Sequence, residues 1–159
     1  MLILGSLPGQ VSLARRQYYA QPYNAFWRIM GALFDAGPER PYPERTTRLA
    51  ACGVALWDVC KAAVRPGSLD ASIDLGSVVP NDFRAFFRTH AAIRAVFTNG
   101  GTATRLYARL VLPRLAEPAR SLPLHPLPST SPAHASLRFE QKLERWRAVA
   151  VAAQVDEAP

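Results

Sequence analysis

The sequence contains few residues of the types that hold metals. Of its 159 residues, two are cysteines and three are histidines. Two thiols are too few for an iron–sulfur cluster, and the histidines have no ligand spacing, so we expect neither a metal nor another cofactor. Cys52 and Cys60 are expected to be small core residues without a disulfide bond.

Long apolar runs are missing as well. No stretch approaches the roughly 20 residues that a membrane span needs, and the N-terminus lacks the basic region and cleavage site of a secretory signal. The GxxxxGK motif of a P-loop and the GxGxxG motif of dinucleotide-binding folds are both absent. We therefore expect a cytoplasmic protein without membrane contact, with one domain over residues 1–159.

Lysine is almost absent, although the chain is strongly basic. The formal net charge is +7 and the pI is about 10.1, yet only Lys61 and Lys142 are lysines. Arginine forms forked hydrogen bonds to phosphate and stacks on aromatic faces, which favours a polyanionic partner such as nucleic acid. A basic surface that serves solubility is the alternative, and charge alone barely separates the two.

Apolar segments predict strands that alternate with helices. The strands are expected at residues 2–4, 54–59, 93–101 and 121–127, and the helices at 24–36, 41–53, 81–90, 102–115 and 137–155. This alternation is typical of a parallel sheet covered by helices on both faces. Two prolines place the fourth strand at an edge of the sheet. The tail at residues 156–159 is expected to fray.

Each predicted strand ends in a loop of unusual composition. These loops read "GSLPGQVS", "WDVCKAAVRPGS", "TNGGTAT" and "PSTSPAHAS". Because the carboxyl ends of parallel strands lie at one edge of a sheet, where such folds bind ligands, the four loops predict one site.

Several residues in these loops have two interpretations. Gly5, Pro8 and Gly9 can let backbone amides approach a ligand, or they can form an ordinary turn. Asn99 and Gly100 open a helix that can cradle a phosphate, or they can simply cap it. The hydroxyls of residues 129–131 can bind phosphate or cap the next helix.

A pair of tyrosines and an asparagine come before the first predicted helix. Tyr18 or Tyr19 can stack on a nucleobase, while the other packs in the core. Asn24 can hold a water molecule through its amide, but asparagine is also a frequent helix cap, and the pattern alone favours the cap.

These segments together resemble a known enzyme superfamily. "YYAQPYNAFW" and "LPSTSPAHA", in order with "LILGSLPG", "ALWDVCKAAVRPGSLDASI" and "FTNGGTA", resemble the uracil-DNA glycosylase superfamily, most closely its hypoxanthine-DNA glycosylase branch. The resemblance covers residues 2–146. It implies a three-layer α/β/α sandwich around a four-stranded parallel sheet, and an enzyme that flips a damaged nucleotide out of DNA into a pocket.

The resemblance also implies a role for individual residues. Asn24 is the implied catalytic residue, and Tyr19 is implied to stack on the flipped base. The implied base contacts are Gly5, Ser6, Leu7, Tyr19 and Asp58. The implied DNA contacts are Pro8, Gly9, Asn99, Gly100, Ser129, Thr130, Ser131, Pro132 and His134.

Two positions depart from the superfamily pattern. Many members carry Asp, Glu or Asn in the first motif to activate water, where this chain has Leu7 and Pro8. Leu127 stands where classical members have the histidine that steadies the departing base. Asn24 is then the nearest candidate to position water, with Asp58 as the second. An amide is a poor base, so we expect slow turnover.

The sequence thus predicts a monomeric, monofunctional DNA glycosylase that removes hypoxanthine or uracil and leaves an abasic site. Two lysines in the whole chain make a Schiff-base lyase step unexpected. Two alternatives stay open: a DNA-binding module on the same fold without catalysis, and a hydrolase of free nucleotides. The sequence does not choose between the two bases.

Overall fold

A four-stranded parallel sheet forms the centre of the protein, whose computed structural model describes residues 1–154. The strands are β1 (Leu2–Gly5), β2 (Ala55–Asp58), β5 (Val96–Asn99) and β6 (Leu124–Leu127), in the order β2-β1-β5-β6. The sheet confirms the predicted strand count and direction. Strand β6 lies at an edge, as its prolines predict.

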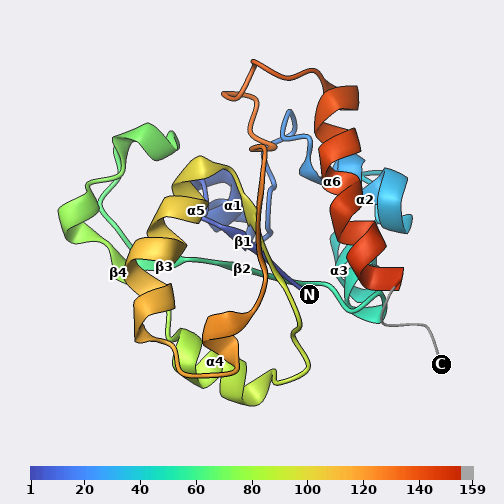
Figure 1. The fold of residues 1–159 in the computed structure, drawn as a ribbon. Coiled ribbons are helices and arrows are strands. Elements are labelled where there is room, and N and C mark those ends of the chain that lie inside the picture. Colours follow the sequence, from blue (N-terminus) through green and yellow to red (C-terminus); the bar gives the residue numbers. More distant parts are fainter. Residues whose placement is uncertain (155–159) are drawn as a thin grey trace.

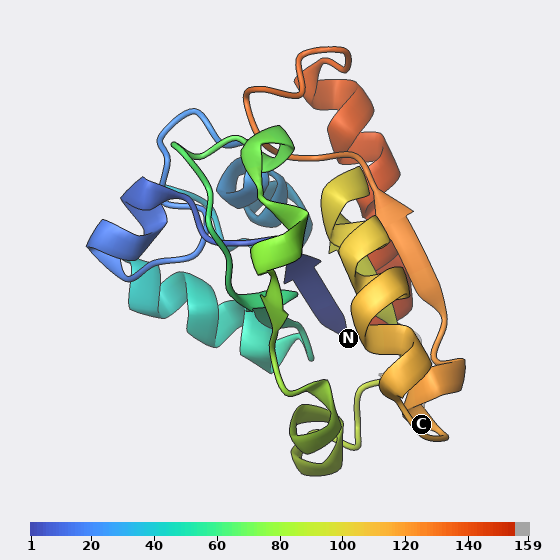
Figure 2. The same cartoon turned by 90° about the vertical axis from the view of Figure 1, so that its left-hand side faces the viewer.

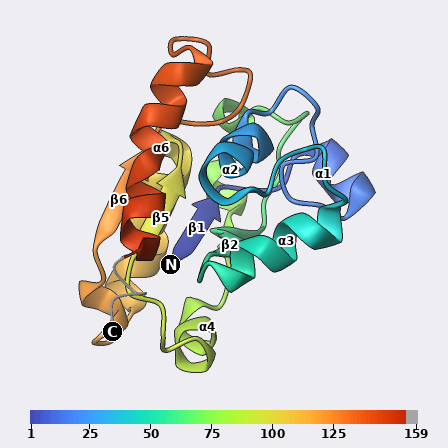
Figure 3. The same ribbon diagram turned by 90° about the vertical axis from the view of Figure 1, so that its right-hand side faces the viewer.

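Helices cover both faces of this sheet. They are α1 (Gln10–Arg15), α2 (Phe26–Phe34), α3 (Tyr42–Ala51), α4 (Phe83–Thr89), α5 (Gly101–Leu106) and α6 (Phe139–Gln154). Figure 1 shows α2, α3 and α6 on one side of the sheet and α4 and α5 on the other. Figure 3 looks onto the first of these layers, with the strands rising toward the loops at the top. The three-layer sandwich is confirmed.

The composition of β1 explains its central position. Leu2, Ile3 and Leu4 have no exposed surface, as expected for a strand that is buried on both faces. Ile3 belongs to the core cluster that also contains Phe26 and Trp146. Leu2 and Leu4 belong to a second cluster, on the side of α4 and α5. The two clusters attach both helical layers to the same strand.

Some elements differ from the prediction. Helix α1 was not predicted, because none of its residues is buried and it has no apolar stripe. A two-stranded antiparallel sheet of β3 (Cys60–Ala62) and β4 (Val79–Pro80) is also new, and both strands are too short to show a period. The helix predicted at 102–115 continues from α5 into a π turn (Tyr107–Val111) and a 3-10 turn (Leu112–Arg114) that contains Pro113. Figure 2 faces this layer.

Three further 3-10 turns connect the main elements, at Asp70–Ser72, Leu75–Ser77 and Ala119–Ser121. Helix α2 begins at Phe26, two residues later than predicted: Ala25 is at the N-cap position, and the side chain of Asn24, one residue earlier, accepts a hydrogen bond from the first helical N–H. The tail expected to fray at 156–159 lies outside the described residues.

Candidate functional site

A cavity of about 590 Å³ opens at the carboxyl edge of the sheet. Loops that follow β1, β2, β5 and β6 line it, together with the segment before α2. Every residue to which the resemblance gave a role lies on its wall: Gly5, Ser6, Leu7, Pro8, Gly9, Tyr19, Asn24, Asp58, Asn99, Gly100, Ser129, Thr130, Ser131, Pro132 and His134. The fold thus brings the predicted site residues together, while their chemical roles stay predictions.

Asn24 both lines the cavity and caps a helix. Its Oδ1 accepts a hydrogen bond of 3.0 Å from the backbone N–H of Phe26. The next residue, Ala25, donates its N–H to the carbonyl oxygen of Thr130, at 3.0 Å, which attaches this segment to the loop after β6. An amide oxygen has two lone pairs, so capping uses only part of the hydrogen-bonding capacity of Asn24.

Tyr19 has an unusual backbone and an unusual hydroxyl. Its φ is 53°, in the left-handed region that residues other than glycine seldom adopt. Its ring stacks on Phe26 with centroids 3.9 Å apart, so only the opposite face is free for a base. The hydroxyl oxygen is enclosed and lies near the Asn99 side chain, but that amide is directed at Thr130, and no hydrogen bond of good geometry satisfies the hydroxyl within residues 1–154. Burial raises the pKa of this hydroxyl, and the charge of Asp58 adds to the effect, so it stays protonated.

Asp58 lies beside Tyr19 at the end of β2. It is 7% exposed, and its carboxyl lies over Gly5, the residue that pairs with it across β1 and β2. No hydrogen bond joins this carboxyl to another group in the described part of the chain. Burial raises the pKa of Asp58 to about 7; Asp70 also raises it, and Arg65 opposes them. We call Gly5, Tyr19 and Asp58 the floor of the cavity.

Gly5 is required where the floor is most crowded. A Cβ on Gly5 would overlap Oδ1 of Asp58 and would lie 3.2 Å from the hydroxyl of Tyr19. The two floor oxygens therefore converge on the point where any other residue would place its side chain.

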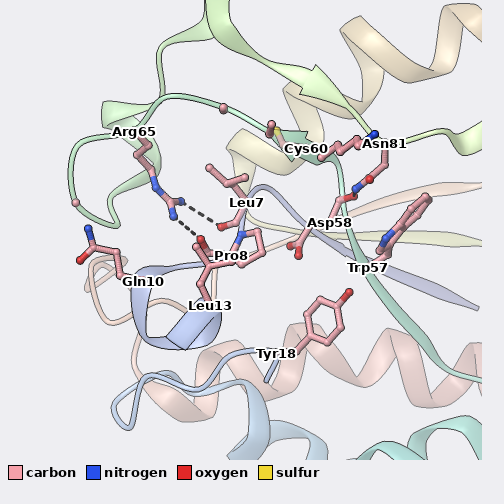
Figure 4. A pocket seen from close by; sticks show the side chains of 14 residues that line it. Leu7, Pro8, Gln10, Leu13, Tyr18, Trp57, Asp58, Cys60, Arg65 and Asn81 are labelled. Carbon is pink, nitrogen blue, oxygen red and sulfur yellow. Dashed lines mark hydrogen bonds between the residues drawn. The ribbon is translucent and has the colours of Figure 1, made fainter. Parts of the chain in front are cut away.

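The loop after β1 is fixed from below by Arg65, whose side chain is only 4% exposed. Its guanidinium donates hydrogen bonds to the carbonyl oxygens of Leu7, at 3.1 Å, and of Pro8, and it pairs with Asp70 at 3.4 Å. Figure 4 shows this fork. Asp70 also accepts a hydrogen bond from Oγ of Ser6, at 2.7 Å. The fork points the two carbonyl groups away from the cavity, which Arg65 does not line.

On the opposite wall, Asn99 and Thr130 hold two strand-end loops together; we call this pair the rim. The Asn99 side chain accepts from the N–H of Thr130 and donates to its hydroxyl, both at 2.9 Å. Gly100 has a φ of 94°, and a Cβ there would lie 2.9 Å from Cβ of Ser129. The rim pair is buried and hydrogen-bonded internally, and its neighbours Pro132 and His134 are more exposed.

Helix α6 supports the loop of residues 128–136. Trp146 donates from Nε1 to the carbonyl oxygen of Pro128, at 3.0 Å. Lys142 is 5% exposed and donates from Nζ to the carbonyl oxygen of Ser131, at 3.2 Å. Burial lowers the pKa of Lys142. Neither Lys142 nor Lys61 lines the cavity.

Several residues of the site were not predicted. Gln21, Ser68, Asp70 and Arg105 also line the cavity. Arg105 had a usable signal, because it stands one helical turn after the glycine pair that opens α5. Ser68 and Asp70 stand in the segment "ALWDVCKAAVRPGSLDASI", which carries part of the resemblance, but this loop has no periodicity that would place them individually.

The described residues hold no group of three His, Cys, Asp or Glu side chains that could bind a metal ion. In the same part of the chain, no helix has the length and apolar character needed to cross a membrane.

Comparison with known proteins agrees with this arrangement. The family model for the uracil DNA glycosylase superfamily matches residues 1–150. The chain belongs to the uracil DNA glycosylase superfamily. A solution NMR structure from Methanosarcina acetivorans, described as a candidate uracil DNA glycosylase, has a TM-score of 0.76 and 30% sequence identity, covering 96% of this chain and 89% of that one.

Two curated relatives are named hypoxanthine DNA glycosylase. The relative from Methanosarcina acetivorans is 38% identical over 104 residues, which are 65% of this chain and 65% of the relative. The relative from Methanosarcina barkeri is 43% identical over 74 residues, 46% of this chain and 47% of the relative. The matches thus span two thirds or less of these relatives' lengths.

Proposed function

We propose that the protein is a monofunctional DNA glycosylase that removes a deaminated base from DNA, with a preference for hypoxanthine over uracil. The observation that carries the proposal is that Asn24, Tyr19 and the loop after β1 line one and the same cavity at the carboxyl edge of the sheet. The order of the two bases rests on the curated relatives, both of which are named for hypoxanthine.

The geometry supports separate roles in this cavity for the residues that bind the base and for the residue that positions water. A flipped base lies on the floor, against the face of Tyr19 that is turned away from Phe26, and its sugar lies toward Asn24. Cleavage of an N-glycosidic bond passes through a sugar cation, so positioning and electrostatics supply most of the catalysis. The amide of Asn24 orients a water molecule toward the sugar carbon, with the hydrogen-bonding capacity that capping leaves free.

The positions of the two lysines, outside the cavity, support a reaction that stops at an abasic site. A lyase step needs an amine next to the sugar, and neither lysine lines the cavity. The arginine-rich surface and the partly exposed residues 131–134 supply contacts with phosphates, which gives salt-sensitive DNA binding. We propose that the protein acts on DNA as a monomer in the cytoplasm.

The test is single-turnover excision from labelled duplexes that hold one deoxyinosine or one deoxyuridine. The wild type is compared with Asn24→Ala and Asn24→Ser, because a serine hydroxyl can still cap the N–H of Phe26. We expect alkali-dependent strand breaks with the wild type, fastest at deoxyinosine. Both variants should lose at least about a hundredfold in rate, since neither keeps an amide beside the sugar.

Three other results would contradict parts of this proposal. Full activity in Asn24→Ser would reduce Asn24 to a helix cap. Binding without cleavage by the wild type would identify a catalytically inactive DNA-binding module. Hydrolysis of free nucleosides or nucleotides, without cleavage in duplex DNA, would identify a small-molecule hydrolase.

A further inference from the structure

A second cavity, of about 540 Å³, lies on the other side of the loop after β1. Its lining includes Tyr18, Trp57, Cys60, Arg65 and Asn81, and Figure 4 shows it from close by. Asp58 lines both cavities, which gives its carboxyl one side toward the proposed base pocket and another toward the second cavity. No other acidic residue has this position in the described part of the chain.

We propose that Asp58 is a catalytic acid that donates its proton to the departing base. The proposal rests on the proposed glycosylase function and assigns a step that Asn24 cannot perform. Hydrolysis needs a group on the sugar side to orient water and a group on the base side to neutralise the charge left on the leaving base. Leu127, an apolar residue that is 8% exposed, cannot be that second group.

Three structural observations support an acid at this position. The carboxyl has no partner in residues 1–154, so no internal hydrogen bond competes for its proton. It converges with the Tyr19 hydroxyl over Gly5, where a planar base would contact both. Its nearest hydrogen-bonded neighbours act on other atoms: Asn81 donates to the backbone carbonyl of Asp58, at 2.8 Å, and leaves the carboxyl free.

Burial and, after it, the charge of Asp70 raise the pKa of Asp58 to about 7, so the carboxyl is mostly protonated below that pH. Asp70, from the 3-10 turn after the long loop, disfavours its ionisation, and Arg65 favours it. Tyr18 and Tyr19 face it from the segment before α2, and Cys60 faces it from β3. Burial raises the pKa of all three of these groups, and the charge of an ionised Asp58 would raise it further, so they stay neutral and do not stabilise an ionised Asp58.

The step balances as an ordinary hydrolysis. As the bond between the sugar C1′ and the base nitrogen breaks, its electron pair goes to the base, and the Asp58 proton passes to a ring nitrogen or carbonyl oxygen of the base. Water adds its oxygen to C1′ and releases a proton to solvent. The carboxylate of Asp58 then regains a proton from solvent through the second cavity, without waiting for the product base to leave.

The test is the pH profile of single-turnover excision at saturating enzyme, for the wild type and for Asp58→Asn. The wild-type rate should be constant below about pH 7 and fall about tenfold per pH unit above it, because the acid must be protonated. Asp58→Asn keeps the shape and a hydrogen-bond donor but has no proton to give. Its rate should be about a hundredfold lower at pH 6 and should not fall above pH 7.

A second pair of variants separates this role from a structural one. Asp70→Asn removes the charge that raises the pKa of Asp58, so the falling limb should move to lower pH. Asp74→Asn, in the same loop, keeps its cap on Gly76 and should leave the limb in place. A merely structural Asp58 gives no such shift.

The outcomes also distinguish this proposal from the proposed function. If the wild type excises the base but the fall in rate above about pH 7 persists in Asp58→Asn, the catalytic acid is overturned and the glycosylase function is not. The same holds if Asp70→Asn does not move this fall to lower pH. Absence of excision by the wild type from pH 5 to pH 9, on either duplex, would overturn the glycosylase and the acid together.

Discussion

At the rim of the cavity, Asn99 and Thr130 exchange two hydrogen bonds, whereas at the floor the Tyr19 hydroxyl and the Asp58 carboxyl have no partner within residues 1–154. Both regions are buried and both come from strand ends. A buried polar group without a hydrogen bond costs about 1–3 kcal/mol, a cost that the rim avoids and that the enclosed Tyr19 hydroxyl at the floor bears. The comparison indicates that the rim maintains the shape of the cavity, while the floor keeps its hydrogen-bonding capacity for a ligand.

The two regions also differ in backbone conformation. Tyr19 at the floor holds a positive φ with a large side chain, while the positive φ near the rim belongs to Gly100, which adopts it without strain. Strained residues that persist in a fold are concentrated at functional sites. Arg16 and Asp35, the other non-glycine residues with a positive φ, end helices α1 and α2, whereas at Tyr19 the positive φ coincides with an enclosed hydroxyl that has no hydrogen bond within residues 1–154.

Filling the floor should have the largest effect on activity. In Gly5→Ala the new methyl group overlaps the Asp58 carboxyl and crowds the Tyr19 hydroxyl, so both must move. We expect the single-turnover excision rate to fall by about a hundredfold or more, since small displacements of reacting groups are costly. Gly76→Ala is the control, because Gly76 does not line the cavity and its methyl group meets only Oδ1 of Asp74, at an ordinary 3.4 Å. Equal losses in the two variants would mean that the floor has no special role.

Breaking the rim should act on stability. Asn99→Ala removes both hydrogen bonds to Thr130 and leaves its N–H without an acceptor. We expect the free energy of unfolding, from urea denaturation, to fall by about 2–4 kcal/mol. Thr89→Ala, which removes an exposed hydroxyl bond to Ala85 in α4, should change it little. An Asn99→Ala protein that is as stable as the wild type would contradict the distinction between rim and floor.

Loosening the support beneath the floor should have the smallest effect. Arg65→Lys keeps the charge but loses the fork that holds the carbonyl groups of Leu7 and Pro8. We expect a decrease of about tenfold in the single-turnover rate, because the loop is less well positioned. Arg84→Lys is the control: Arg84 donates to the carbonyl oxygen of Arg114, far from the cavity, and the rate should not change. A similar decrease in both variants would show that Arg65 has no specific role in positioning the loop after β1.

The sequence predicted the sheet because its evidence is local. Each strand is a short apolar run, and the loops after them carry glycine, proline and hydroxyl residues that could be read directly. It also placed Asn24 at the start of α2, where its side chain accepts from the N–H of Phe26, and on the wall of the cavity, while its role in holding water stays a prediction. Local chemistry cannot decide which of the two functions matters more.

The floor itself could not be predicted from local patterns. Asp58 meets Gly5 because β2 lies beside β1 in a register that pairs these two residues, and Tyr19 arrives from a loop outside the sheet. Arg65 binds Pro8 and Leu7, which lie 57 and 58 positions earlier in the chain, and it reaches them from a loop without periodicity. Contacts of this kind depend on strand order and loop path, which no single segment encodes.

The most direct test of the difference between rim and floor is the free energy of unfolding of the wild type and Asp58→Asn as a function of pH. The pKa of Asp58 is raised by folding to about 7, so its neutral form favours the native state at low pH, and this advantage is lost as the pH rises through that value. We expect Asp58→Asn to gain stability relative to the wild type between about pH 4 and pH 7, reaching a few kcal/mol, and to keep a constant advantage above that range. If the difference in the free energy of unfolding between the two proteins does not change with pH, Asp58 is ionised and hydrogen-bonded within the fold. That result would contradict a floor whose polar groups have no partner in the absence of a ligand.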